Sequence, residues 1–281
     1  DKRDALLLQH PESLKERYNL DVRIFTEVLS IYTDEKKVSV KNLQTGEIYL
    51  ESYDKLLLSP GAEPIKPPFE GINSDKIYTL RNIPDMDKIV EKTKNAQNFV
   101  VVGGGFIGLE VAENLIEAGK SVKLVELGNQ VMAPVDFDIA SFVNEKAKQK
   151  GLELLLNVGV EKFNDKGETI EVFLNNGISV ETDAVILAIG VKPETKLAVE
   201  AGLEIGETRG ILVNEFMQTS NPDIYAVGDA IEVAHYINNK KVLIPLAWPA
   251  NRQGRIVADN IVLGNQYKYT GSLGSSILKF F

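Results

Sequence analysis

The chain has 281 residues, 44% of them hydrophobic, which is enough to bury one large core or the cores of two ordinary domains, and two domains are favoured. Its 40 acidic and 31 basic side chains give a formal net charge of −9, which repels a phosphate backbone and argues against nucleic acid as a partner. The absence of cysteine excludes disulfides, thiolate metal sites and a thiol nucleophile within this chain.

The sequence predicts neither a membrane helix nor a metal site. The apolar run of residues 99–109 is shorter than the roughly 18 residues that a membrane span needs, and it is followed at once by Glu110. His10 and His235, the two histidines, have no recurring ligand spacing. A secretion signal is also absent, so we expect a cytoplasmic protein.

Short β-rich runs in the first 60 residues predict an antiparallel meander. They are residues 21–25, 37–40 and 47–50, with a turn at Thr45-Gly46. A buried strand follows at residues 55–58 and ends in Ser59-Pro60-Gly61. Prolines at 64, 67 and 68 then interrupt regular structure, so this stretch predicts a crossover between two domains.

A strand, a glycine loop, a helix and a second strand are predicted from residue 99 onward. The helix carries an apolar stripe from Ile107 to Ala118, and a second helix runs from about Asp136 to Gly151. The strands are residues 100–102, 122–125 and 152–156. This βαβ order predicts an α/β domain of the Rossmann type.

An antiparallel meander is predicted as an insertion in this domain, because the hydrophobic period returns to two between Val158 and Val180. Beyond Gly210 the chain is expected to rejoin the first domain. The elements predicted after the meander are strands at residues 184–188 and 224–227 and a helix at 250–263.

The glycine loop of residues 103–108 predicts a nucleotide site. Gly103 allows a tight turn, Gly105 lets a pyrophosphate approach the backbone, and Gly108 lets helix and strand pack closely. The helix N-terminus then presents free N–H groups and a positive dipole end to the anion. A purely structural turn is the alternative interpretation.

Glu126 closes the following strand, where a carboxylate can accept hydrogen bonds from a ribose diol. The same carboxylate repels a 2′-phosphate. We therefore expect NAD(H) to be preferred over NADP(H).

Two further segments are candidates for a cofactor site. Asp229 follows the strand of residues 224–227, where ligands gather in open α/β sheets, although a glycine and an aspartate after a strand more often form an ordinary turn. Residues 245–255 predict a helix start whose backbone donors face a flat ligand. Trp248, the only tryptophan, is more often a core residue than a platform for a cofactor.

Several motifs in this order resemble the pyridine nucleotide-disulfide oxidoreductases, and the branch with CoA-disulfide reductases, NADH oxidases and persulfide reductases is the most similar. The motifs are residues 52–55, 58–62, 79–82, 103–110, 188–193, 225–229 and 245–255. The resemblance implies that NADH gives hydride to FAD, and that the flavin reduces a cysteine acting on a disulfide, a persulfide or an oxygen species. It also implies a homodimeric parent protein.

The resemblance assigns residues to both cofactors. Gly103, Gly105, Phe106, Ile107, Gly108, Glu110, Glu126 and Gly190 would contact NAD(H), with Phe106 as the aromatic that gates the nicotinamide. Ser59, Pro60, Gly61, Arg81, Asp229, Ala230, Ala247, Trp248 and Asn251 would line the FAD site.

The chain departs from the family in lacking a first glycine-rich FAD unit and the redox cysteine. We therefore expect an internal portion of a longer protein that retains little FAD, has no turnover and contains no catalytic residue. Residues 1–80 and 209–281 would be an incomplete three-layer β/β/α FAD domain, with a dimerisation domain starting at about 270–281. Residues 81–208 would be the NAD(H) domain. The apolar end, residues 277–281, is expected to be an unpaired strand.

Two alternatives stay open at this point. The parent is either a disulfide or persulfide reductase or an NADH oxidase or peroxidase, and the residues around a redox cysteine would separate these. A nucleotide-binding or redox-sensing protein without catalysis is the alternative from another class.

Overall fold

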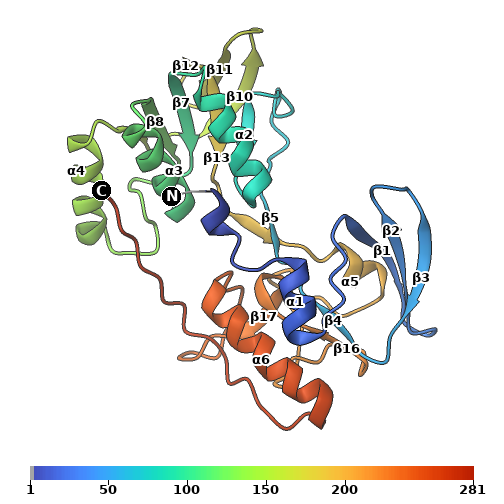
Figure 1. Ribbon diagram of the computed structural model, residues 1–281. Helices are drawn as coiled ribbons and strands as arrows, with labels where there is room; N and C mark the ends of the chain where they lie inside the picture. Colours follow the sequence, from blue (N-terminus) through green and yellow to red (C-terminus); the bar gives the residue numbers. More distant parts are fainter. Residues whose placement is uncertain (1–2) are drawn as a thin grey trace. The chain divides into compact units, whose positions relative to one another are not determined.

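The computed structural model describes residues 3–281, apart from the side chain of Asp4. The chain divides into two compact units, which are described separately (Figure 1). Unit 1 comprises residues 1–61 and 194–273, and unit 2 comprises residues 62–193 and 274–281. None of the described helices is long and apolar enough to cross a membrane.

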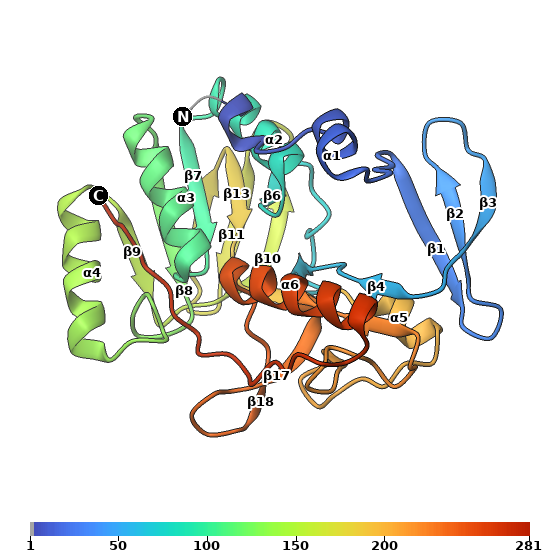
Figure 2. The ribbon, with the colours of Figure 1, turned by 60° about the horizontal axis from the view of Figure 1, so that its bottom comes forward.

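Unit 2 is built on a five-stranded parallel sheet of order β6-β13-β7-β8-β9. The strands are β6 (Ile77–Thr79), β7 (Asn98–Val102), β8 (Ser121–Glu126), β9 (Glu153–Leu156) and β13 (Ala184–Leu187). The helices are α2 (Ile83–Thr93), α3 (Phe106–Glu117) and α4 (Phe137–Gln149). The predicted Rossmann-like fold is therefore confirmed, with α3 and α4 on one side of β7 and β8 (Figure 2).

The continuous apolar sequence of β7 follows from burial on both faces of the sheet. Phe99 and Val101 pack in the cluster that includes α3, whereas Val100 and Val102 pack against an antiparallel meander. That meander is the predicted insertion, and its strands are β10 (Val160–Asp165), β11 (Ile170–Leu174) and β12 (Ser179–Thr182). The pair β5 (Ala62–Pro64) and β14 (Val191–Pro193) completes the unit.

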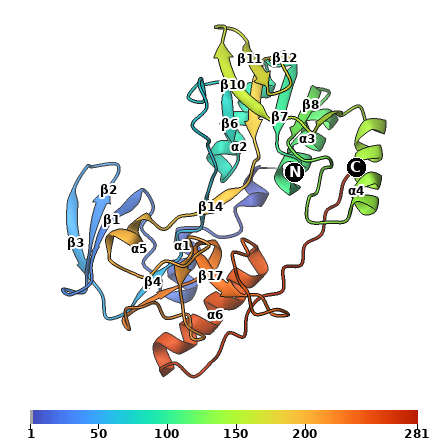
Figure 3. The ribbon, with the colours of Figure 1, turned by 180° about the vertical axis from the view of Figure 1, so that it is seen from behind.

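Unit 1 contains the predicted N-terminal antiparallel meander (Figure 3). Its strands are β1 (Thr26–Tyr32), β2 (Lys37–Asn42) and β3 (Ile48–Ser52). The prediction of a strand at residues 21–25 is wrong, because Phe25 has a left-handed φ of 53° and the strand begins after it. The remaining elements are η1 (Arg3–Leu6), α1 (Pro11–Tyr18), β4 (Leu56–Leu58), α5 (Lys196–Glu200), β15 (Ile211–Leu212), β16 (Ile224–Ala226), η2 (Gly228–Ala230), β17 (Ile231–Ala234), β18 (Lys241–Val242) and α6 (Ala247–Leu263).

The chain passes between the two units at Gly61/Ala62, at Pro193/Glu194 and at Leu273/Gly274, whereas the sequence suggested domain boundaries at residues 80/81 and 208/209. Residues 62–80 belong to unit 2 because β5 and β6 pair with β14 and β13. Residues 194–208 belong to unit 1 because Ala198 and Leu203 pack in its core cluster. The sequences of β5 and β6 show no hydrophobic period by which these two strands could be recognised.

The C-terminal residues contain no strand, so the expectation of an unpaired strand at residues 277–281 is wrong. Leu278 and Phe280 instead pack against the core cluster of α3, and the Phe281 N–H donates to Glu113 Oε1 at 2.6 Å. Packing against this cluster removes part of the apolar surface of the two side chains from water.

Candidate functional site

The glycine loop leaves β7 at the carboxyl edge of the parallel sheet in unit 2. Gly103 N donates to Val125 O of β8 at 2.8 Å, and Ala188 N, after β13, donates to Val102 O at 2.8 Å. The loop is therefore held between the ends of three neighbouring strands. Ligands of open α/β sheets bind at this edge.

The three loop glycines differ in what surrounds them. A Cβ on Gly103, where φ is 107°, would lie 2.4 Å from Ala188 O, and one on Gly108 would lie 1.9 Å from Gly103 O. Packing inside the protein therefore requires glycine at both positions. A Cβ on Gly105 would meet no protein atom within 4 Å. The space beside Gly105 is open to a ligand.

Helix α3 begins directly at this open space. Gly105 is its N-cap, and the first backbone hydrogen bond runs from Leu109 N to Gly105 O at 3.0 Å. The N–H groups of Phe106 and Ile107 precede that bond, so they have no acceptor in the helix. Together with the positive end of the helix dipole they form an anion-binding arrangement.

Glu126, the last residue of β8, links the glycine loop to the loop that follows β8. Its Oε2 accepts from Gly104 N at 2.6 Å, and its Oε1 accepts from Gly128 N at 2.7 Å. The side chain is half-buried. Each carboxylate oxygen has a second lone pair, so the group can still accept hydrogen bonds from a ligand.

The other residues predicted in this unit have separate positions. Glu110 is exposed on α3, and Gly190, with φ of 103°, follows β13 and accepts a hydrogen bond from Ile65 N at 3.0 Å. Arg81 precedes α2 and donates its N–H to Asp85 Oδ2 at 3.1 Å. Arg81 thus belongs to unit 2. The segment 59–61, which was predicted to line the FAD site together with Arg81, belongs to unit 1.

In unit 1, two predicted segments leave the same edge of a parallel strand pair. Leu58 of β4 lies opposite Ala226 of β16, and Val227 N donates to Leu58 O at 3.0 Å. The segment Ser59-Pro60-Gly61 therefore emerges beside η2, which contains Asp229 and Ala230. Ala230 is completely buried.

A residue that sequence analysis missed fixes this turn. Gln253 of α6 is 2% exposed, and its Oε1 accepts from Gly228 N at 2.8 Å, where Gly228 has φ of 81°. Gln253 lies on the buried stripe of α6 with Pro249, Val257 and Asn260. A polar residue at helical spacing among buried positions is the signal that would have identified it.

The N-terminus of α6 differs from the prediction in the residue at which the helix starts and in the exposure of Trp248. The helix begins at Ala247 rather than Ala250, because Pro249 is tolerated within the first turn. Trp248 is 77% exposed, so the interpretation of this side chain as core is wrong. Asn251 is also exposed.

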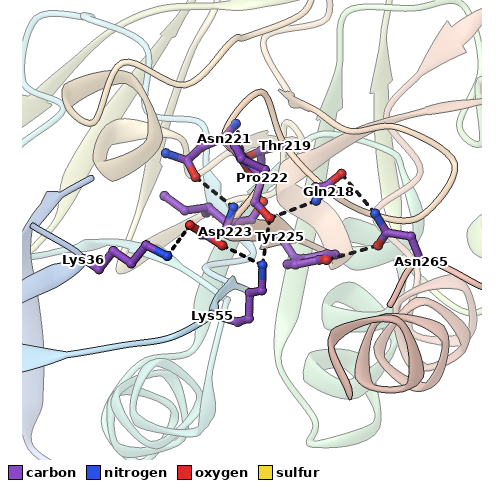
Figure 4. A network of polar contacts seen from close by, with 10 residues as sticks. Lys36, Lys55, Gln218, Thr219, Asn221, Pro222, Asp223, Tyr225 and Asn265 are labelled. Carbon is purple, nitrogen blue, oxygen red and sulfur yellow. Dashed lines mark hydrogen bonds and ion pairs between the residues drawn. The ribbon is translucent and has the colours of Figure 1, made fainter. Parts of the chain in front are cut away.

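A polar network lies at the opposite end of β16 (Figure 4). Asp223 Oδ1 accepts from Lys55 Nζ at 2.6 Å, and Oδ2 pairs with Lys36 Nζ at 2.5 Å. These two ammonium groups hold the pKa of Asp223 below its ordinary value, with Lys36 the larger cause. The network joins β4 and β16 to the turn before β2, which helps to fix the strand pair that carries both segments.

The chain is similar to proteins of a known family. Residues 2–254 match the family model described as pyridine nucleotide-disulphide oxidoreductase. The chain is 36% identical over 279 residues to an NADH oxidase of Enterococcus faecalis, covering 98% of this chain and 62% of that protein.

Two solved structures are also similar. The reduced CoADR-RHD of Bacillus anthracis has 47% identity and a TM-score of 0.95, over 100% of this chain and 50% of that one. An NAD-dependent persulfide reductase of A. fulgidus has 35% identity and a TM-score of 0.92, over 96% of this chain and 50% of that one. The chain thus spans about half to two-thirds of the length of these relatives. Since the family model covers nearly all of both units, the chain belongs to the pyridine nucleotide-disulphide oxidoreductases.

Proposed function

We propose that unit 2 binds NADH at the glycine loop. The observation that carries the proposal is the open space beside Gly105 at the N-terminus of α3, flanked by Gly103 and Gly108 in positions that only glycine can fill. A pyrophosphate placed there accepts hydrogen bonds from the first amides of α3. Phe106, Ile107, Glu110 and Gly190 are proposed to contact the nicotinamide half.

Glu126 supports a preference for NADH over NADPH. Its carboxylate is held by Gly104 N and Gly128 N, and its remaining lone pairs can accept from the two ribose hydroxyls. A 2′-phosphate placed there would bring two anionic groups close together, and like charges in such contact repel each other.

Unit 1 is proposed to be the FAD domain and unit 2 the NAD(H) domain. Segments 59–61 and 228–230 leave one sheet edge, and α6 presents its N-terminus with Ala247, Trp248 and Asn251. FAD held by these residues would supply the capacity to take up a hydride from NADH and to release electrons to an acceptor. This chain has no cysteine, so it supplies no thiol for the reduction of a disulfide. We therefore propose that it delivers hydride and has no turnover of its own.

The acceptor served by the longer protein is proposed to be a disulfide, a persulfide or a CoA disulfide. The relative named a persulfide reductase favours this class. Oxygen is the second candidate, which the relative named NADH oxidase favours. We also propose that the longer protein is a cytoplasmic homodimer.

Calorimetric titration of the purified chain with NADH and with NADPH tests the nucleotide assignment. We expect tighter binding of NADH, and we expect Glu126→Ala to weaken NADH binding by about 10- to 100-fold, since a hydrogen bond to a charged acceptor contributes about 1.5–3 kcal/mol. Flavin absorbance of the same preparation should show little retained FAD.

Glu161→Ala is the matched control, because Glu161 is exposed on the meander of the same unit. The affinity of the Glu161→Ala variant for NADH should equal that of the original chain. Equal affinities of the original chain for both nucleotides would contradict the role proposed for Glu126, and no binding of either would contradict the function.

A further inference from the structure

The loop between β8 and α4 contains a strained residue beside the glycine loop. Met132 has a left-handed φ of 53°, although its side chain is long and 5% exposed. A bulky residue in this region costs on the order of 1–3 kcal/mol and persists only where surrounding contacts hold it. Such strain is common where a backbone group must be presented in one direction.

The group that Met132 presents is its N–H, which donates to Gly104 O at 2.8 Å. Gly104 is held from its other side as well, because its N–H donates to Glu126 Oε2 at 2.6 Å. Both peptide groups that flank Gly104 are therefore fixed. One of them is the Gly104–Gly105 peptide at the entrance to α3.

The direction of the Gly105 N–H is coupled to the direction of Gly104 O, because both belong to one planar trans peptide. The C=O and the N–H of such a peptide point in opposite directions. Because Gly104 O points toward Met132, the Gly105 N–H points away from Met132. The open space that a Cβ on Gly105 would enter contains no protein atom within 4 Å. The contact with Met132 thus sets the direction of an amide at the edge of the proposed pyrophosphate site.

Side chains on both sides of Met132 hold the strained turn. Gln130 Nε2 donates to Val135 O at 2.8 Å and to Met132 O at 3.5 Å. Val131, which is fully buried, donates its N–H to Asn144 Oδ1 of α4 at 3.4 Å. Val131 also limits Gly104, since a Cβ on Gly104 would lie 3.0 Å from Val131 Cγ1.

We propose that the turn of residues 130–135 is a positioning device for dinucleotide binding and that Gln130 is its positioning residue. Gln130 acts through Met132 and Gly104, and it touches neither the nucleotide nor the reacting atoms. The inference rests on the proposed NADH site. It predicts that the orientation of the Gly104–Gly105 peptide can be lost while the protein stays folded.

Two variants separate positioning from stability. Gln130→Ala removes the donor that holds the turn, so the dissociation constant for NADH should rise by about five- to tenfold, as expected for one hydrogen bond of roughly 1 kcal/mol, while the melting temperature changes little. Gln130→Glu keeps the shape without the donor and should behave like Gln130→Ala.

Met132→Gly should give the opposite result. Glycine adopts the left-handed conformation without strain and keeps the N–H, so affinity for NADH should stay within about twofold of the original. Loss of a buried methionine side chain should lower the melting temperature. Gln149→Ala, on α4, is the matched control and should leave both quantities unchanged.

Amide hydrogen exchange of Met132, followed by NMR without nucleotide, tests the geometry independently. Exchange should be slow in the original chain and faster in Gln130→Ala. Fast exchange in the original chain would overturn the inference, as would equal NADH affinities of the original and Gln130→Ala. Failure of the original chain to bind NADH, with slow Met132 exchange, would instead overturn the proposed function.

Discussion

At the scale of single residues, Gly105 and Gly108 provide opposite tests of the glycine loop. A methyl group on Gly108 would overlap Gly103 O, so Gly108→Ala should cost about 1–3 kcal/mol of unfolding free energy or more. In Gly105→Ala the new methyl group would meet no protein atom, and the φ of −79° suits alanine, so the free energy of unfolding should be unchanged. Affinity for NADH should fall by about tenfold or more, because the methyl group fills the space of the ligand.

Urea unfolding and NADH titration of both variants measure the two quantities separately. Gly119→Ala is a control for a glycine outside the loop, although its φ of 76° adds backbone strain of its own. Unchanged NADH affinity in Gly105→Ala would show that the ligand does not approach the backbone there.

Residue positions could be predicted where a single local rule determines them. Gly103 and Gly108 lie where the structure leaves no room for a side chain, as their spacing predicts. The roles of Gly105 and Glu126 toward a nucleotide stay predictions. Gln253 and Met132 could not be predicted in this way, since their roles depend on Gly228 and Gly104, which are distant in sequence.

At the scale of elements, Asp165 connects the meander to the segment before β6. Its carboxylate accepts hydrogen bonds from Ser74 Oγ, from Gly167 N at 2.9 Å and from Lys76 Nζ at 2.9 Å. These donors, Ser74 foremost, lower the pKa of Asp165 to about 2. Since the folded-state pKa lies below the unfolded value of about 3.9, this stabilisation is complete above pH 4 and is lost as the pH falls toward 2.

Asp165→Asn should therefore be less stable than the original chain at pH 7, and the difference should shrink between pH 4 and pH 2. Urea midpoints measured across that range test this expectation. Asp259→Asn, on the exposed side of α6, is the control. A difference that stays constant down to pH 2 would mean that the charge of Asp165 is not what stabilises the contact.

The elements that could be predicted are those with a clear apolar pattern. The run β7-α3-β8-α4-β9 matches the predicted order because its strands are apolar on both faces and its helices carry an apolar stripe. Short elements such as β5 and β14 were missed, since each has only three residues and they pair across a long stretch of sequence that no local pattern records.

At the scale of the whole molecule, two units with separate cores imply separate responses to a ligand. Cluster residues such as Ile224 and Val257 lie in unit 1, and those such as Leu109 and Leu124 lie in unit 2. If the NADH site is complete within unit 2, the nucleotide stabilises that unit against unfolding. The other unit gains nothing from the same binding event.

Hydrogen exchange followed by mass spectrometry, with and without NADH, measures this difference. At a free NADH concentration about 100 times the dissociation constant, linkage contributes about 2.7 kcal/mol, so amides of β7, β8 and α3 that exchange by opening of unit 2 should slow by about 100-fold. Amides of β1 and β2 should exchange at an unchanged rate, because their sheet belongs to unit 1. Equal slowing in both sheets would mean that the two units unfold as one cooperative body, and slowing of β1 and β2 alone would place the nucleotide in the other unit.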